Sequence, residues 1–532
     1  MITSSLLSRP GRTAPAGSAA LRCRDRLAQR VADQVGPDGL VKAPCASRVL
    51  ESSLLLRLLT VEGYAPHVRE RLTRYLRNRL EHRPPDAIQG AVARAALGER
   101  LPGGCFAERA LASFDHFTAD RKRLMFTTLL AELGVTVFPR TRPEAFTARG
   151  QQSWLQAEMA ALKIMTAYGT GTTGLLTERD WFLLAPAVRP GPVWEGNHFA
   201  RLLALLALRK NPAHRGAVRR TLEAVTADLR PDGGLPFITG MDIFATAIAG
   251  LALTGPAACA HAGHRPVRCG TGPLPAAMAD ALATRQNPDG GFAFTPGVRQ
   301  SDVDDTSYTV EFLRVAGPYR HRSAIAAAER YLLAVRNPDG GFPTFARGTP
   351  SEIAMTAAAV NALAPNPAHR TVVDEALAFL TRRRQPDGIL ERSWSRNVTN
   401  AVFRTTLACA AAGPGAPPGL SRAAGTTKRQ ATRYLASVQN LDGGWGHHPG
   451  DASDPISTAY AVIALSRDGG HPTALARALD HLVRAQRPDG GYRSRPDQAG
   501  PRPLLYDVPA LADVCVLLGL AHAVGPTARP RV

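Results

Sequence analysis

The sequence predicts an all-α protein, and two observations carry that prediction. A turn motif centred on Pro-Asp-Gly-Gly followed by an aromatic residue recurs along the chain, with about 50 residues between copies from residue 286 onward. The stretches between the copies are rich in Ala and Leu at helical spacing, such as AIAAAERYLLAVR and ALARALDHLVRAQ. Strand signals are nearly absent. Each repeat has room for two helices and two turns, and stacked helix pairs can close into an α/α barrel.

The copies of the turn motif share one physical design. Pro and Asp favour entry into a turn, and Gly accepts a positive φ where a helix must stop and reverse. The aromatic residue can pack back onto the helix pair. The copies are LRPDGGLPF from Leu229, QNPDGGFAF from Gln286, RNPDGGFPTF from Arg336, RQPDGIL from Arg384, QNLDGGWG from Gln439 and QRPDGGY from Gln486, with a weaker copy, VGPDGL, from Val35.

The chain divides into two predicted helical domains. Residues 1–20 are expected to be a disordered tail, and residues 21–255, which hold few turn motifs, form the first domain. Residues 256–275 are rich in Pro, Gly and small residues and are predicted to be a linker. The regular array over residues 276–525 forms the second domain. A helix predicted near residues 22–34 can belong to either domain.

Composition narrows the class of protein. The chain has 532 residues, which favours two domains over one. The net charge of +20 comes mostly from scattered Arg, with no basic run or aromatic-interleaved stripe, so nucleic-acid binding is not predicted. An Arg-rich composition or an anionic small substrate explains the charge.

No apolar run of membrane-spanning length and no secretory signal are seen. Seven dispersed Cys without a C-x-x-C pair indicate reduced thiols and a cytoplasmic protein. The oligomeric state stays open.

A cluster of acidic residues marks the most unusual segment. The stretch SDVDDTSYTVEFLRV, residues 301–315, places Asp302, Asp304 and Asp305 where an apolar helical pattern begins. Helix capping is the simplest explanation, but adjacent carboxylates repel, and three exceed what a cap needs. In a partly apolar cavity they cannot all ionise, so one keeps its proton near neutral pH. Such a dry acid can protonate a weak base, even a carbon–carbon double bond.

The D-V-D-D-T at 302–306 resembles the D-x-D-D motif of class II terpene cyclases. The Q-x-x-D-G-G-[FW] turns resemble the QW motifs of the squalene-hopene cyclase superfamily, and together the two cover about residues 230–495. This resemblance implies two α-helical barrels, a γ-like first domain and a β-like second domain, with the active site in the cavity between them. It also implies that the middle aspartate, Asp304, is the general acid, and that Asp302 and Asp305 orient it.

The resemblance implies a linear prenyl diphosphate as substrate. The two metal-binding motifs of class I enzymes are missing, so the product is expected to keep its diphosphate. The segment ERSWSRNVTNAVFR, residues 391–404, departs from the W-H-x-S-P-Y-Y of bacterial copalyl-type enzymes. We therefore expect farnesyl diphosphate to be converted to drimenyl diphosphate. The alternative is geranylgeranyl diphosphate converted to a copalyl-type product.

Residues for the rest of the substrate are drawn from the predicted helices and from the aromatic residues of the array. Two helical stretches, residues 156–171 and 193–210, offer cations and a helix start for the diphosphate. The head-group candidates are Lys163, Asn197, His198 and Arg201, the candidate Mg²⁺ ligands are Glu158 and Glu195, and the candidate aromatic walls are Trp394, Phe403 and Tyr506.

Two functions of other classes fit parts of the pattern. A protein prenyltransferase β-like subunit shares the barrel and the turns, but it needs a zinc site of Asp, Cys and His and a partner subunit. Cys515 near Asp513 lacks a His companion. A non-catalytic α/α toroid that only binds a ligand leaves the three aspartates unexplained. Zinc analysis and incubation with prenyl diphosphates separate these functions from a cyclase.

Overall fold

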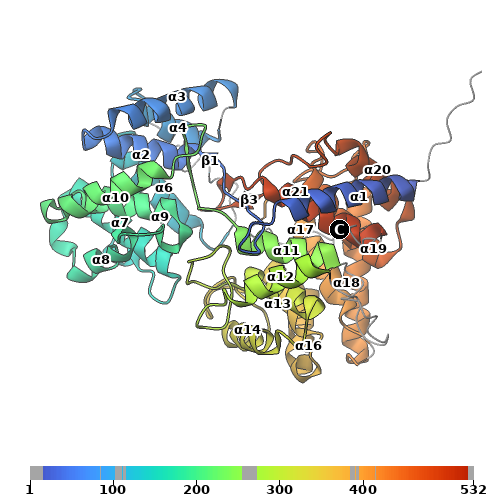
Figure 1. Ribbon diagram of the computed structural model, residues 1–532. Coiled ribbons are helices and arrows are strands. Elements are labelled where there is room, and N and C mark those ends of the chain that lie inside the picture. Colours follow the sequence, from blue (N-terminus) through green and yellow to red (C-terminus); the bar gives the residue numbers. More distant parts are fainter. Residues whose placement is uncertain are drawn as a thin grey trace, which may run out of the picture.

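The computed structural model describes residues 16–83, 85–101, 111, 116–254, 272–383, 390, 395–413 and 415–524 (Figure 1). The all-α prediction is confirmed for this part of the chain. Its only named strands are four of two residues each: β1 (Ser47–Arg48) pairs with β2 (Leu235–Pro236), and β3 (Gln498–Ala499) pairs with β4 (Leu505–Tyr506). None of the described helices is long and apolar enough to cross a membrane.

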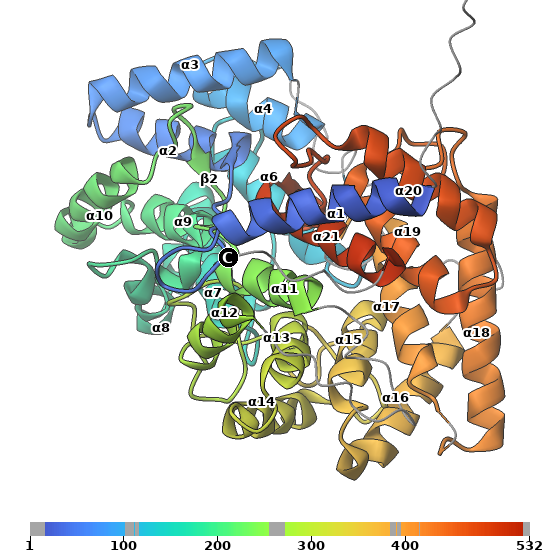
Figure 2. The ribbon, with the colours of Figure 1, turned by 45° about the vertical axis from the view of Figure 1, so that its right-hand side comes forward.

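The second domain is a double ring of helices (Figure 2). Each inner helix contacts the next, and the last contacts the first, which closes the ring. The inner helices are buried along nearly their whole length, whereas the outer helices bury one face. The inner ring is α11 (Asp242–Thr254), α13 (Val303–Ala316), α15 (Ile353–Leu363), α17 (Val398–Ala410), α19 (Pro455–Asp468) and α21 (Ala510–Val524). The outer ring is α12 (Pro273–Ala283), α14 (Arg322–Val335), α16 (Arg370–Arg383), α18 (Pro418–Ser437), α20 (Pro472–Ala485) and α1 (Ala16–Asp33).

Two helices of this double ring come mostly from the stretch predicted as the first domain, residues 21–255, and α1 begins at Ala16, inside the stretch 1–20 predicted to be a disordered tail. Helix α1 packs against α20 and α21, so the N-terminal helix belongs to the second domain. Gln486 Nε2 donates to the carbonyl of Cys23 on α1 at 2.9 Å, as Gln286 Nε2 donates to Ala324 on α14 at 2.8 Å. Helix α11 packs between α13 and α21. It is apolar on all sides, and the inner ring supplies the fully buried position that such a helix needs.

The turn motif fixes where each inner helix begins. Asp289 Oδ1 accepts from the amide of Gly291 at 2.9 Å and from the hydroxyl of Ser301 at 2.8 Å. Gly290 has φ 87°, and a Cβ there would lie 2.5 Å from a backbone carbonyl oxygen of α14. Only Gly fits this turn. The turn therefore holds Ser301, and with it the first residues of α13, in a set position.

The first domain is a separate helical bundle with its own core (Figure 1). Helices α2, α4, α6, α7 and α9 contact one another in a circuit, with α3 and α10 packed on the outside. The helices are α2 (Val49–Val61), α3 (Pro66–His82), α4 (Ala87–Ala96), α6 (Ala119–Glu132), α7 (Ser153–Thr170), α8 (Glu178–Phe182), α9 (His198–Leu208) and α10 (Arg215–Ala227).

Candidate active site

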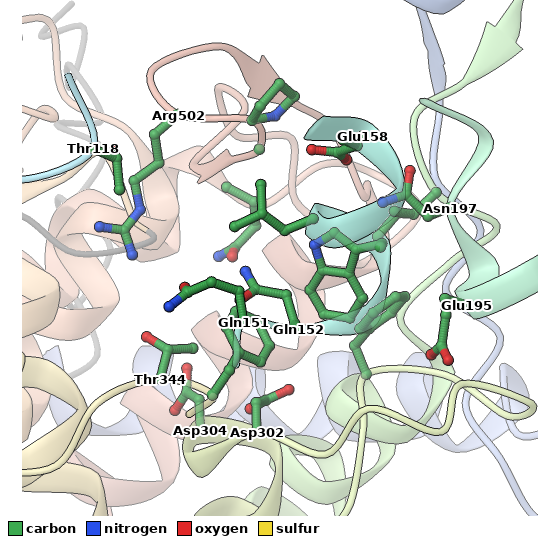
Figure 3. Close-up of a pocket in the computed structure, with 18 of the residues that line it drawn as sticks. Thr118, Gln151, Gln152, Glu158, Glu195, Asn197, Asp302, Asp304, Thr344 and Arg502 are labelled. Atoms are coloured by element: carbon green, nitrogen blue, oxygen red, sulfur yellow. The ribbon is translucent and has the colours of Figure 1, made fainter. Parts of the chain in front are cut away.

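One cavity of the described structure is lined by residues of both domains (Figure 3). It encloses about 1310 Å³ of empty space, its mouth included. The first domain contributes side chains of α6 and α7, and the second contributes the start of α13 and the segment around β3 and β4. In Figure 3, Asp302 and Asp304 lie on one side of this space, Glu158 and Asn197 lie on the opposite side, and the guanidinium of Arg502 extends toward Thr344, beside Asp304. The aspartates therefore mark one end of the cavity.

The three aspartates sit where α13 begins, as predicted. Asp302 is the N-cap, and its Oδ1 accepts from the amide of Asp305 at 2.8 Å. Burial raises the pKa of Asp302 to about 6, although its hydrogen bonds with Asp305 oppose the shift. Burial and the neighbouring Asp302 hold the pKa of Asp305 well above its ordinary range. These two carboxyls are buried, whereas 25% of the Asp304 side chain is exposed. Asp304 is therefore the aspartate most open to the cavity.

Asp304 has a cationic partner that the sequence analysis missed. Arg404 of α17 forms an ion pair with Asp304 and lies 3.8 Å from the centroid of the Tyr308 ring. Burial raises the pKa of Asp304, and the charge of Arg404 opposes that shift. The only signal in the sequence is an Arg inside an otherwise apolar helical segment, NAVFRTTLAC.

The opposite end of the cavity carries two neighbouring cations of α6. Lys122 is buried, and burial lowers the pKa of its ammonium to about 8. Arg121 Nε is buried and has no hydrogen-bond partner among the described residues. A desolvated cation without a full set of partners favours an anionic ligand. This pair was also missed, because RKRL in a helical pattern looks like a solvated face.

Arg502 adds a further cation to the cavity, from the loop between β3 and β4. Its Nη2 donates to Glu352 Oε2 at 2.9 Å, and its Nη1 lies against His116 of the first domain. Burial favours the neutral form of Glu352, but Arg502 and the Thr344 hydroxyl outweigh it and hold the pKa of Glu352 below its ordinary value. Burial lowers the pKa of His116 to about 4, so its imidazole is neutral near pH 7.

Four of the predicted substrate and metal residues line this cavity, namely Glu158, Glu195, Asn197 and Tyr506. Asn197 is also the N-cap of α9, where its Oδ1 accepts from the amide of Ala200 at 3.0 Å. Burial raises the pKa of Glu158 to about 7, against the attraction of Lys122 and Arg121.

Three predicted head-group residues lie elsewhere. Lys163 forms an ion pair with Asp180 at 2.7 Å, in another pocket of the first domain. Arg201 is buried and donates to the backbone carbonyls of Ala187 and Pro192. His198 is buried, and burial lowers its pKa to about 3. None of the three lines this cavity, so the structure does not bring them to the aspartate cluster.

Of the predicted aromatic walls, only Tyr506 is found in the cavity. Phe403 stacks on Tyr460 with the ring centroids 4.6 Å apart, inside the barrel. Its helix directs the neighbouring Arg404 toward Asp304 instead. Trp394 lies outside the described residues. The aromatic residues that do line the cavity, and that sequence reasoning did not select, are Phe117, Trp154, Phe237, Phe244, Phe294 and Phe345.

The two predicted Mg²⁺ ligands differ in how well they fit an ion. Glu195 Oε2 accepts from the amides of Arg299 at 3.0 Å and Gln300 at 3.2 Å, so it holds the loop before α13. Glu158 fits better, because its carboxyl borders the cationic end of the cavity. Within the described ranges, no group of three or more His, Cys, Asp or Glu is placed to hold a metal.

An α/α barrel with an aspartate cluster at a cavity shared with a second helical domain is the architecture of a class II terpene cyclase. The family model of the prenyltransferase alpha-alpha toroid domain matches residues 273–500. The chain is 57% identical to a drimenyl diphosphate synthase of Streptomyces showdoensis, over 96% of each chain. It therefore belongs to the drimenyl diphosphate synthase family within this class of isomerases.

Two more distant proteins also resemble this chain. A squalene–hopene cyclase of Bradyrhizobium diazoefficiens is 27% identical over 38% of this chain and 35% of its own length. The solved structure of an ent-copalyl diphosphate synthase from Streptomyces platensis superposes with a TM-score of 0.55 at 18% identity, and covers 96% of this chain and 100% of that chain. The structural likeness shows that the two proteins share the two-domain fold.

Proposed function

We propose that this protein protonates the terminal alkene of farnesyl diphosphate and cyclises it to drimenyl diphosphate, with the diphosphate retained. The observation that carries the proposal is the cavity itself: an aspartate cluster at one end, buried cations at the other, and aromatic walls between them. A prenyl diphosphate has a matching layout, with an alkene at one end and a double phosphate at the other. The name of the 57% identical relative supports the same reaction.

At the acidic end, Asp304 is the proposed donor. Its proton passes to the terminal alkene, which leaves a carboxylate on Asp304 and a tertiary carbocation on the substrate. The remaining alkenes attack in turn to form two rings, and loss of one proton from the last cation gives the product. Atoms balance as an isomerisation. The faces of Phe244, Phe294 and Tyr506, which line the cavity beside the aspartates, are suited to stabilise the cations.

At the cationic end, Arg121, Lys122 and Arg502 would hold the diphosphate. Mg²⁺ would enter with the diphosphate as its counter-ion, and Glu158 is the carboxylate placed to reach it. These contacts would anchor the head group. No carboxylate cluster among the described residues is arranged to bind metal ions that would pull the diphosphate away as a leaving group. The carbon–oxygen bond to the diphosphate is therefore expected to survive the reaction.

Two points of the proposal concern specificity and location. Geranylgeranyl diphosphate with a copalyl-type product is the second candidate, supported by the shared fold of the ent-copalyl diphosphate synthase. We favour the C15 substrate because of the closer sequence match.

The four described cysteines, Cys23, Cys45, Cys409 and Cys515, are buried free thiols, which supports action in the cytoplasm.

The test offers farnesyl and geranylgeranyl diphosphate with Mg²⁺, separately and in competition, followed by mass spectrometry with and without phosphatase. We expect a bicyclic C15 alcohol only after phosphatase treatment, and a higher kcat/KM for farnesyl diphosphate. Hydrocarbon or free alcohol without phosphatase would contradict retention of the diphosphate. A higher kcat/KM for geranylgeranyl diphosphate would make the copalyl-type reaction the function.

A further inference from the structure

A buried guanidinium lies directly behind the proposed acid. Arg404 is 2% exposed and pairs with Asp304, yet it is not among the residues that line the cavity. It therefore has no route to contact the substrate. An arginine remains charged at every pH at which the protein is folded, and an enclosed charge is costly unless its surroundings stabilise it. The free-energy cost of burying this charge points to a role for Arg404 beyond packing.

The face of α13 that carries Asp304 explains how Arg404 is held. Asp304, Tyr308 and Glu311 follow one another at intervals of four and three residues, so they share one face of the helix. The Arg404 guanidinium lies 3.8 Å from the centroid of the Tyr308 ring, a cation–π contact that does not depend on the protonation of Asp304. Glu311 adds a second acidic group whose charge acts on Arg404. Arg404 can thus stay in place while Asp304 carries its proton.

Proton transfer changes what Arg404 interacts with. Before the transfer the Asp304 carboxyl is neutral, and it gains little from the neighbouring cation. After the transfer the carboxyl is an anion in direct contact with a desolvated guanidinium, where the attraction is strong. An interaction that strengthens along the reaction lowers the barrier, whereas one of constant strength does not.

We propose that Arg404 is a positioning residue for the proton transfer, which orients the Asp304 carboxyl toward the cavity and stabilises the carboxylate that remains when the proton leaves. This inference rests on the proposed role of Asp304. The proton moves from Asp304 oxygen to the alkene carbon, and the electron pair of the broken O–H bond stays on the carboxylate beside Arg404. A proton from solvent restores the acid after product release.

Several other groups contribute to the charge balance around this pair. The Tyr308, Tyr460 and Cys515 groups are neutral over the working range, because burial raises each pKa well above neutral pH. The remaining charge is set by the acidic groups. The titratable groups that face Asp304 or Arg404 are Asp302, Asp305, Tyr308 and Glu311 of the α13 segment, Glu352 before α15, Tyr460 of α19 and Cys515 of α21.

Arg404→Gln tests the proposal through a pH profile. Loss of the cation makes the carboxylate less stable, so the pKa of the acid rises. We expect kcat with farnesyl diphosphate to fall about 10²-fold at its plateau, with KM changed less than about threefold. In a plot of kcat against pH, the limb on which kcat falls as the pH rises should lie at higher pH than in the wild type. A kcat within about threefold of wild type, or a reduced kcat with an unmoved pH limb, would overturn the proposal.

Two further variants keep the test decisive. Arg404→Lys retains the charge, so its pH limb should stay at the wild-type position, and kcat should fall by less than in Arg404→Gln. If Arg404→Gln does not fold, a wild-type kcat in Arg404→Lys overturns the proposal. Burial raises the pKa of Glu311 to about 7, so above that pH Glu311→Gln removes a negative charge near Asp304, and the fall of kcat with rising pH should move to lower pH. Arg209→Gln is the matched control, since it removes an arginine that pairs with Glu62 at 2.9 Å in the first domain. Its pH limb should not move.

The two proposals fail in different ways. If Asp304→Asn is inactive while both Arg404 variants behave as wild type, the cyclase mechanism stands and the role of Arg404 is wrong. If Asp304→Asn retains activity, the assignment of the acid itself is wrong. An infrared carboxylic-acid band that is lost in Asp304→Asn, and that titrates to higher pH in Arg404→Gln, would support the role of Arg404 without reference to turnover.

Discussion

Two neighbouring copies of the turn motif each place an acidic residue at the candidate active-site cavity. The copies beginning at Gln286 and Arg336 are offset by 50 residues, and their scaffolds are the same. The Phe amide that follows the glycines donates to a Thr hydroxyl of the next inner helix at 2.9 Å in both copies. In each copy, an acidic residue follows the serine held by the turn: Asp302 in the first and Glu352 in the second.

The two acidic residues nevertheless have opposite electrostatic states. Asp302 shares its site with two further aspartates, and its pKa is raised. The positions that correspond to Asp304 and Asp305 in the second copy are Ala354 and Met355, and Glu352 instead pairs with Arg502. The scaffold therefore sets where a carboxyl is placed, and its immediate neighbours decide whether it keeps a proton or acts as an anion. One copy carries the proposed acid, and the other supports Arg502, a residue of the proposed diphosphate site.

Removing the acid should have the largest effect. Asp304→Asn preserves size and hydrogen bonding but has no acidic proton, so we expect kcat to fall by at least about 10³-fold. Asp302→Asn and Asp305→Asn should cost less if they only tune the acid, although a coupled group can respond as a unit. Circular dichroism should show unchanged helix content. A turnover above about a tenth of wild type in Asp304→Asn, together with an inactive Asp302→Asn, would shift the acid to another residue.

The cationic end should respond through substrate binding. Lys122→Met removes one charge-assisted contact with the diphosphate, so we expect KM to rise about 10- to 100-fold with a smaller change in kcat. Lys163→Met is the matched control, because Lys163 pairs with Asp180 outside the cavity. Steady-state kinetics with farnesyl diphosphate distinguish the two. Equal effects of the two substitutions would place the head group elsewhere.

The fold and the place of the aspartate cluster were predictable from the sequence because both depend on local patterns, and the role of Asp304 as the acid stays a prediction. The repeat spacing and the turn chemistry determine the ring, and three aspartates at a helix start are visible by inspection. Arg404 comes from a helix 100 residues further along the chain, and its pairing with Asp304 depends on ring closure. A helical pattern alone does not distinguish Lys122, which faces the cavity, from Lys163, which has Asp180 beside it. The place of α1 in the second domain likewise depends on a contact with Gln486, near the other end of the chain.

Substitution of Glu352, in the copy of the turn motif that begins at Arg336, should lower the stability of the protein more than it lowers kcat. Glu352→Gln leaves the buried guanidinium of Arg502 without its anion, so we expect a loss of about 3 kcal/mol in denaturant unfolding and a KM raised about tenfold. The folded-state pKa of Glu352 lies below its ordinary value of 4.5, so the stability it contributes is present above that pH and shrinks as the pH falls. A stability difference between wild type and variant that grows toward low pH would contradict the ion pair.

Loss of the turn hydrogen bonds should lower the stability of the protein equally in the two copies of the turn motif. Asp289→Ala and Asp339→Ala each remove the acceptor of one amide and one serine hydroxyl, so we expect each to cost about 1–2 kcal/mol in thermal or denaturant unfolding. The kcat at a temperature well below the transition separates them, since Asp289→Ala loosens the segment that carries Asp302, whereas Asp339→Ala loosens the segment that carries Glu352 and should act on KM. Unequal stability losses would show that the two turns are not equivalent.

The most direct test of the central claim is the reaction of farnesyl diphosphate in deuterium oxide, followed by phosphatase and mass spectrometry. An acid that exchanges with solvent and protonates the terminal alkene leaves one deuterium on carbon in every product molecule. The proton lost at the end comes from the substrate, so the product should be one mass unit heavier than in ordinary water, and its diphosphate should remain until phosphatase is added. A cyclised product without deuterium, or one released without phosphatase, would contradict cyclisation initiated by the aspartate cluster.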